Sequence, residues 1–150
     1  MKGVYVLFME LESSKQIEIG KLGKIGFKKG FYAYVGSAMN GLENRIQRHL
    51  KREKKLHWHI DWFLRSAKIK DVIYLESSNK MECRVAQALA KRFESIKGFG
   101  SSDCKCISHM FFSTDLQLLK HFVAVVFSSS YVNLSVGESA RKVFTKETYQ

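Results

Sequence analysis

The first forty residues of this 150-residue chain are dominated by runs of β-forming side chains separated by glycine. Residues 3–10 alternate and are rich in β-branched and aromatic side chains, residues 16–20 resemble a short second strand, and residues 31–36 a third. A basic segment punctuated by glycine, residues 21–30, is expected to connect the last two. Because helical patterns follow these strands, the sequence predicts one mixed α/β domain spanning residues 1–150.

The next segment carries the pattern of an amphipathic helix. Asn40 with Glu43 three residues later resembles a capping box, which predicts a helix that begins there and ends near Arg52. Its apolar stripe consists of Leu42, Ile46 and Leu50. The cations on a neighbouring face are Arg45, His49 and Arg52. Arg48 and Lys51 are expected to point more toward solvent.

Further elements follow at shorter intervals. The pattern predicts a helix over about residues 58–65, a strand over 69–75, a helix over about 81–94 and a short strand over 109–112. In the 81–94 helix, the apolar positions are Val85, Ala86, Leu89 and Phe93. One turn before this stripe stands Glu82, a carboxylate that either faces a shared cleft or is simply favoured by the helix dipole.

The C-terminal part of the chain is harder to interpret. Residues 123–128 and 131–134 look like β segments, and residues 139–148 are polar. No apolar run approaches the roughly 20 residues of a membrane span, so we expect no membrane association. No secretory leader is evident at the start, and we expect a cytoplasmic protein.

The charge of the chain is concentrated in one third of its length. The formal net charge is +11, and residues 21–70 hold thirteen basic and only three acidic side chains. A field of this kind favours a polyanionic partner, although lysine can also serve solubility alone. Composition does not separate nucleic acid from an anionic membrane surface.

The chain has three cysteines, Cys83, Cys104 and Cys106. An odd number without a leader argues against a secreted disulfide framework. Cys104, Cys106 and His109 could hold zinc, with Cys83, His57 or His59 as a fourth ligand. Their spacing differs from that of a structural zinc double knuckle, so half-buried free cysteines are favoured.

A second group of candidate metal ligands is His57, His59 and Asp61, which would share one face of an extended segment. The neighbouring aromatic side chains favour a helix there instead. A contact of one histidine with a phosphate backbone, or with the loop that contains Asp103, is equally compatible with the sequence.

Two short tyrosine-bearing runs stand about thirty residues apart, Gly3-Val-Tyr5 and Tyr34-Val-Gly36, and a helix with Arg45 follows. Together they resemble the two name motifs and the arginine of the GIY-YIG endonuclease superfamily. Residues 31–38, 45–49, 57–61 and 100–106 look like a small uncharacterised prokaryotic branch of it. The resemblance covers about residues 1–115, and residues 120–150 are a C-terminal extension without a counterpart. Valine replaces the isoleucine of both motifs, a change expected to be harmless on a buried strand.

The resemblance implies a small, mainly antiparallel sheet flanked by helices, and a metal-dependent endonuclease that hydrolyses DNA. Tyr5 would activate or orient the attacking water, Tyr34 would position water and phosphate, and Arg45 would hold the phosphate. Glu82, with Glu76 as the alternative, would bind one divalent cation, Mg²⁺ or Mn²⁺. His49 would contact phosphate or pack against the sheet. Gly3 and Gly36 would be structural glycines that allow close approach.

The cations expected to contact the nucleic acid backbone flank these motifs. They are Lys24, Lys28, Lys29, Arg48, Lys51, Arg52, Lys54 and Lys55. The sequence leaves open whether the substrate is branched or damaged DNA or even RNA, and what the oligomeric state is. Two alternatives remain: a non-catalytic DNA- or RNA-binding module that retains the nuclease fold, and an adaptor domain whose tyrosines belong to the core.

Overall fold

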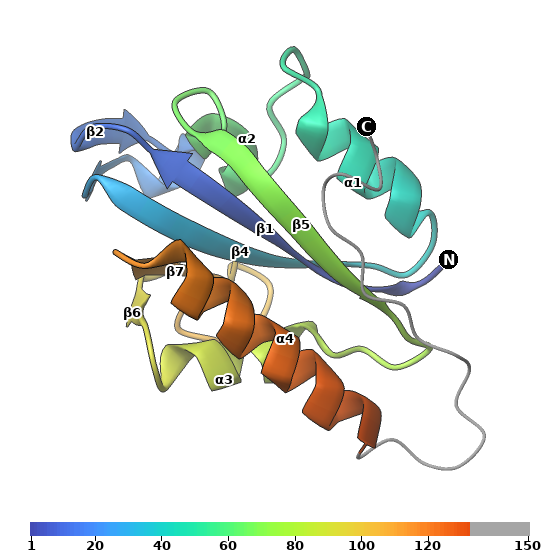
Figure 1. The fold of residues 1–150 in the computed structure, drawn as a ribbon. Coiled ribbons are helices and arrows are strands. Elements are labelled where there is room, and N and C mark those ends of the chain that lie inside the picture. Colours follow the sequence, from blue (N-terminus) through green and yellow to red (C-terminus); the bar gives the residue numbers. More distant parts are fainter. Residues whose placement is uncertain (133–150) are drawn as a thin grey trace.

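The computed structural model describes the backbone of residues 1–132 and the side chains of residues 1–128. Its centre is a five-stranded sheet in the order β5-β1-β4-β7-β6, in which every neighbouring pair is antiparallel. The strands are β1 (Gly3–Leu11), β4 (Gly30–Ala38), β5 (Lys68–Glu76), β6 (Glu94–Ser95) and β7 (Met110–Ser113). The predicted α+β class with a mainly antiparallel sheet is therefore confirmed (Figure 1).

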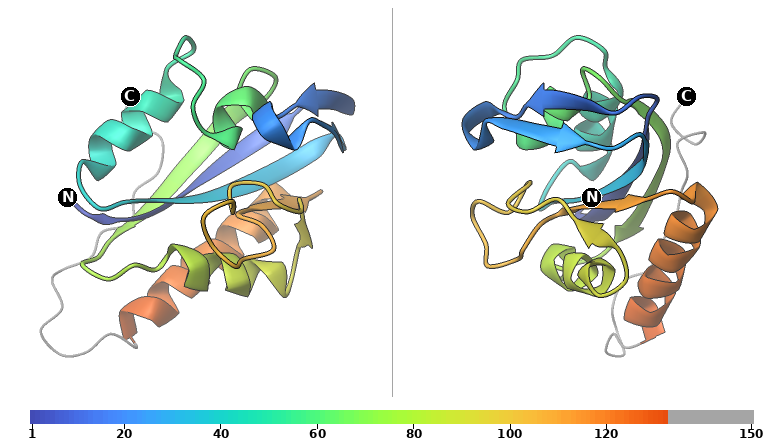
Figure 2. Two further views of the ribbon diagram at one scale, coloured as in Figure 1. Left: turned by 180° about the vertical axis from the view of Figure 1, so that it is seen from behind. Right: turned by 90° about the vertical axis from the view of Figure 1, so that its left-hand side faces the viewer.

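Helices cover both faces of the sheet (Figure 2). On one face lie α1 (Leu42–Leu50), α2 (His59–Phe63) and the hairpin of β2 (Lys15–Glu18) and β3 (Lys24–Phe27), with the 3₁₀ turn η1 (Gly20–Leu22) between the two strands. On the other face lie α3 (Glu82–Ala90) and α4 (Leu116–Val132). Each layer encloses its own apolar cluster, so the sheet is a shared wall between two cores.

β1 is an interior strand of this sheet. It pairs with β4 on one side and β5 on the other, and residues 4–9 are buried without interruption. The predicted alternation of buried and exposed positions in this segment is wrong. A strand covered on both faces has no side that faces solvent. The continuous apolar character of Val4 to Met9 reflects that double coverage.

Several predicted elements match the structure within a few residues. The strand predicted over 69–75 is β5, the one over 109–112 is β7, and the helix over 81–94 is α3, whose Val85, Ala86 and Leu89 are buried as the stripe required. The helix predicted over 58–65 is the shorter α2. The segment expected to be a connection, residues 21–30, contains η1 and β3.

Two other predictions are wrong. The helix α1 is preceded by Gly41, which takes a left-handed conformation with φ of 68° and provides no side-chain cap, so Asn40 is not its N-cap. Residues 123–128 form helix and not strand, because they belong to α4. Residues 131 and 132 are also helical, whereas 133, 134 and 139–148 lie outside the described residues.

The pairing of β4 changes along its length, and this change places the site. Residues 31–34 pair with β7, and the last contact on that side is the hydrogen bond from the Val35 N–H to the His109 carbonyl, at 2.9 Å. Beyond it, Ser37 has no strand on that side. Because backbone groups alternate in direction along a strand, its carbonyl faces the open edge.

Candidate functional site

Tyr5 and Gly36 are direct partners across β1 and β4. A Cβ atom built on Gly36 would lie 2.4 Å from both Cζ and the hydroxyl oxygen of Tyr5, a separation that packed atoms do not tolerate. A Cβ on Gly3 would lie 2.2 Å from the Leu75 carbonyl oxygen. The two glycines of the motifs thus allow close backbone packing at one position and seat the Tyr5 ring at the other.

The hydroxyl of Tyr5 contacts a buried histidine. Its oxygen lies 2.7 Å from Nε2 of His49, which is on α1 and only 2% exposed. Burial lowers the pKa of His49 to about 3, so the imidazole is neutral near pH 7. The direction of the bond follows the tautomer: a ring protonated at Nδ1 accepts the Tyr5 O–H at Nε2, and a ring protonated at Nε2 donates to the Tyr5 oxygen. Nδ1 is buried without a hydrogen-bond partner among the described residues. Burial also raises the pKa of Tyr5 well above its ordinary value, against the opposing charge of Arg45.

Tyr34 lies on the same strand as Gly36 and on the same face of the sheet as Tyr5. Its ring makes edge contacts with His49 and Phe99 and is 7% exposed. Gly100, with φ of +71°, lies so close that a Cβ there would be 3.0 Å from the tyrosine ring. Burial raises the pKa of Tyr34 well above its ordinary value. Both tyrosines are therefore protonated phenols at neutral pH.

Arg45 and Glu82 meet at Ser37, on the open edge of β4. The Arg45 guanidinium donates from Nη1 to the Ser37 carbonyl at 2.8 Å. The Ser37 hydroxyl donates to Oε1 of Glu82 at 3.1 Å. One serine thus joins α1 on one face of the sheet to the first turn of α3 on the other. Arg45 also stacks over Trp58, with Cζ 4.7 Å from the ring centroid.

These side chains line one polar cleft of about 270 Å³. Its walls comprise Tyr5, Tyr34, Gly36, Ser37, Arg45, His57, Trp58, His59, Glu82, Gly100, Ser102 and Asp103. They come from β1, β4, α1, α2, α3 and two loops, so the cleft exists only in the folded chain. Of the residues that we predicted for catalysis and metal binding, Tyr5, Tyr34, Arg45 and Glu82 line it, and His49 lies behind Tyr5. Glu76, the alternative carboxylate, is not among its lining residues.

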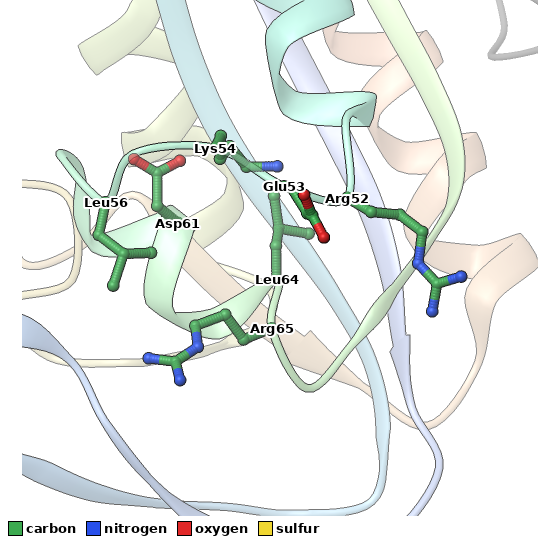
Figure 3. A pocket seen from close by; sticks show the side chains of 7 residues that line it. All are labelled: Arg52, Glu53, Lys54, Leu56, Asp61, Leu64 and Arg65. Atoms are coloured by element: carbon green, nitrogen blue, oxygen red, sulfur yellow. The ribbon is translucent and has the colours of Figure 1, made fainter.

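A second hollow, of about 360 Å³, lies between the segment that follows α1 and helix α2 (Figure 3). Asp61 contributes a buried carboxylate to it and accepts hydrogen bonds from the backbone N–H groups of His57 and Trp58. Arg48 completes the arrangement, with Nη1 and Nη2 each 3.1 Å from a different Asp61 oxygen. Burial opposes ionisation of Asp61, but these bonds outweigh it and hold its pKa below the ordinary value.

This arrangement corrects one prediction, the orientation of Arg48, and agrees with the helix that was favoured over a metal set of His57, His59 and Asp61. Arg48 does not point freely toward solvent, because Asp61 and the Lys55 carbonyl occupy its guanidinium. Asp61 does not join His57 and His59 in a metal set, because it holds the start of α2. The His59 ring accepts at Nδ1 a hydrogen bond from the Gly100 N–H at 2.9 Å. Of the alternatives left open for these histidines, the structure shows a contact of His59 with the loop that contains Asp103.

Six of the remaining predicted cations form two groups. The exposed side chains of Lys51, Arg52 and Lys55 belong to the segment that joins α1 to the Trp58 wall of the cleft. Lys24 lies on β3 and Lys28 and Lys29 precede β4, at the opposite end of that strand from Ser37. Lys28 pairs there with Glu94 at 2.7 Å. Lys54 donates its ammonium to the carbonyls of His49 and Lys51 at the C-terminus of α1.

Behind Glu82 lies a compact group of thiols and one imidazole. It comprises Cys83, Cys104, Cys106 and His109, whose candidate ligand atoms all lie within 4.8 Å of one another. All three thiols are free and half-buried. Nδ1 of His109 is 3.0 Å from Oε2 of Glu82. Of the three candidates for a fourth member, the structure assembles Cys83, whereas His57 and His59 line the cleft.

The site also depends on Ser37, Trp58 and the carbonyl of His109, which were not among the predicted residues. Ser37 could have been found as the residue directly after the Tyr34-Val-Gly36 motif. The other two emerge only from tertiary packing.

Comparison with known proteins places the chain in a family. The profile of the domain of unknown function DUF123 matches residues 4–132. The chain belongs to this family. The match extends past residue 115, where the superfamily resemblance ended, and takes in all of α4. No curated protein and no solved structure matches the chain. Among the described helices of this DUF123 member, none has the length and apolar character needed to cross a bilayer.

Proposed function

We propose that this DUF123 protein is a divalent-metal-dependent endonuclease of the GIY-YIG type that hydrolyses phosphodiester bonds in DNA. One observation carries the proposal: Tyr5, Tyr34, Arg45 and Glu82, which are far apart in sequence, line a single cleft. The three free thiols suit the reducing cytoplasm, where we place the enzyme.

Arg45 is suited to hold the scissile phosphate. A guanidinium is permanently charged and has five N–H donors in a planar fork that matches phosphate oxygens. The Ser37 carbonyl fixes the group from one side and the Trp58 ring supports it. Arg45 therefore presents a preoriented cation where negative charge grows on the nonbridging oxygens.

Tyr5, held by His49, is suited to orient the attacking water. A phenol with a strongly raised pKa is a poor base by itself, but its hydroxyl can accept a hydrogen bond from water while donating to His49. With its proton on Nδ1, neutral His49 accepts the Tyr5 O–H at Nε2, which leaves lone pairs of the Tyr5 oxygen for a hydrogen bond from the attacking water. In this proposal Tyr5 and Tyr34 together orient that water.

Glu82 is the carboxylate available to a divalent cation in the cleft. Its oxygens bond to Ser37 and His109, yet a carboxylate has about four lone-pair positions, so capacity remains. Mg²⁺ is commonly held by one or two carboxylates together with substrate phosphates, and a single glutamate fits that pattern. When bound, such a cation would stabilise negative charge on the leaving oxygen.

The test is cleavage of labelled linear, nicked and branched DNA, and of a matched RNA, with Mg²⁺, Mn²⁺ or EDTA. Tyr5→Phe removes the hydroxyl in the cleft, and Tyr32→Phe is its matched control, because Tyr32 is a buried strand tyrosine that donates to the Lys28 carbonyl and does not line the cleft. We expect cutting that EDTA abolishes, a loss of about 10²–10⁴-fold in Tyr5→Phe, and little change in Tyr32→Phe.

Binding is followed on the same samples across a salt series. Salt-sensitive binding without cutting of any substrate would replace this proposal by a non-catalytic nucleic-acid-binding module. Equal cutting by wild type and Tyr5→Phe would remove the assigned role of Tyr5. If the protein neither binds nor cuts any of these nucleic acids, an adaptor domain would be favoured.

A further inference from the structure

We infer that Cys83, Cys104, Cys106 and His109 form a binding site for one Zn²⁺ ion. Cys83 is in the first turn of α3, and the other three come from the loop that leads into β7. The structure brings their three sulfur atoms and one ring nitrogen within 4.8 Å of one another. Across residues 1–128, no other group of histidine, cysteine and acidic side chains converges in this way. The inference does not rest on the proposed nuclease activity.

The distances fit a tetrahedral ion. Zinc bonds of about 2.0–2.1 Å to nitrogen and about 2.3 Å to sulfur place those two atoms about 3.5 Å apart at the tetrahedral angle. Nε2 of His109 lies 3.4 Å from Sγ of Cys104 and 3.9 Å from Sγ of Cys83. The four side chains therefore need only small adjustments to share one ion.

The histidine is held in the orientation that a ligand requires. Nε2 of His109 faces the thiols while Nδ1 faces Oε2 of Glu82 at 3.0 Å, and the side chain is 1% exposed. Zinc-bound histidines commonly donate their other ring N–H to a carboxylate, which fixes the tautomer and strengthens the ligand. Glu82 is itself held by the Ser37 hydroxyl. The pair thus supplies the outer contacts of a zinc site.

The ligand chemistry selects zinc over the cation proposed for the cleft. Three thiolates and one imidazole are soft or borderline ligands in a closed set of four, whereas Mg²⁺ prefers six oxygen ligands. A disulfide would use two of the three thiols and leave the third unpaired beside the imidazole. A four-ligand zinc site uses every member of the group.

Zinc would add a link between the loop over residues 98–109 and α3. Hydrogen bonds from the Gly98 N–H to the Ile107 carbonyl and from the His109 N–H to the Phe99 carbonyl already hold the two ends of the loop together. The loop over residues 98–109 contains positive-φ glycines at Gly98 and Gly100 and is anchored to α2 through His59. A zinc ion would tie this loop to the start of α3, which carries Glu82. The walls of the cleft formed by Gly100 and Glu82 would then depend on the metal.

The first test is the metal content of the full chain, purified in reductant and measured by elemental mass spectrometry. We expect about one zinc per chain, absent from Cys83→Ser, Cys106→Ser and His109→Ala. His121→Ala is the matched control, because His121 is an exposed histidine on α4. The inference would be overturned by a zinc content far below one per chain that does not rise when Zn²⁺ is added. Iron bound in place of zinc would overturn it as well.

A second measurement remains valid if the variants fail to fold. Wild-type protein stripped with a chelator is titrated with Co²⁺, which in a tetrahedral thiolate site gives intense visible bands and a sulfur-to-cobalt charge-transfer band. We expect saturation at one equivalent and displacement of Co²⁺ by Zn²⁺. Weak bands typical of octahedral cobalt, or no saturation, would overturn the inference.

Glu82→Gln tests the outer contact. We expect about 10- to 100-fold weaker zinc binding with the four ligands unchanged. Hydrogen exchange gives an independent readout: metal removal should speed exchange in residues 98–109 and leave β1 protected. Identical exchange in the zinc-loaded and stripped protein would contradict a structural role for the ion.

Discussion

Arg45 and Arg48 stand on the same helix and stack over the same indole ring, at 4.7 and 4.5 Å from its centroid, yet their surroundings differ. Arg48 is bound through both terminal nitrogens by the buried Asp61 and by a carbonyl. Arg45 is fixed by one carbonyl and lines an open polar cleft. The difference shows how one basic helix uses one cation to hold the fold together and leaves another facing an open cleft.

Replacing Arg45 should give the largest effect. Arg45→Lys keeps the charge but loses the planar fork, and we expect DNA cleavage to fall by about 10²–10³-fold. Thermal unfolding should change little, because the side chain is only partly buried. Single-turnover cleavage and a melting curve check both statements. A cleavage rate within a factor of about three of wild type would remove Arg45 from the proposed mechanism.

Replacing Arg48 should have the opposite profile. Arg48→Ala leaves the Asp61 carboxylate buried without its charge partner, and we expect about 2–3 kcal/mol less free energy of unfolding. Urea denaturation measures this. Well below the unfolding transition, the cleavage rate should stay close to wild type, and a rate loss as large as that of Arg45→Lys would erase the contrast.

Gly36→Ala tests how tightly Tyr5 is seated. The new methyl group would meet the Tyr5 ring at 2.4 Å, so we expect about 1–3 kcal/mol of destabilisation together with displacement of the hydroxyl from His49. Gly26→Ala is the control, because nothing lies within 4 Å of the position its Cβ would take. Equal stability of the two variants in urea would contradict the packing described for Tyr5.

His49 should make the fold sensitive to acid. Its folded-state pKa of about 3 lies below the ordinary value of 6.5, so between these pH values the unfolded chain binds a proton that the folded chain does not. Stability is therefore full above pH 6.5 and declines toward pH 3, by up to about 1.4 kcal/mol per pH unit from this group. His49→Gln should show a shallower slope in urea titrations over this range. Parallel slopes would rule out His49 as the cause.

The smallest expected effect is on the salt dependence of DNA binding, which should differ between the two groups of basic side chains. Changing Lys51, Arg52 and Lys55 together to alanine should make DNA binding less dependent on salt, with a log–log slope shallower by about 0.9 for each phosphate that is no longer neutralised. The same change at Lys24, Lys28 and Lys29 should matter less, because these residues lie at the far end of β4. Equal effects would show that the bound DNA extends along the whole strand.

Strands and helices that carry a clear period were predictable from the sequence. The stripe of α3 led to Glu82, because a helix places residues one turn apart on the same face. Residues 123–128 were predicted wrongly because a run of β-branched valines outweighed a weaker helical signal. That signal was present in the spacing of Leu116, Leu119, Val123 and Phe127, and in Asp115, which accepts the Leu118 N–H at the start of α4.

The site was predictable only in part. Motif residues on adjacent strands, such as Tyr5 and Gly36, are brought together by simple antiparallel pairing. The partners of Arg48 and Glu82 were not predictable, because a hydrogen bond between side chains far apart in sequence leaves no periodic pattern in the local sequence. Cys83 was one of three candidates for a place beside Cys104, Cys106 and His109, and nothing in the local sequence separated it from His57 and His59.

The hydrogen bonds that build the cleft also bear on how the chain folds. Tyr5 and His49 are 44 residues apart in sequence, and Ser37 and Glu82 are 45 apart. Contacts between residues so far apart in sequence carry a high loop-closure cost and need the intervening chain in place before they can form. The cleft is therefore absent from a nascent chain until residues as far as Ser102 and Asp103 have emerged from the ribosome. Whatever chemistry it performs is withheld during synthesis and ceases as soon as the sheet opens.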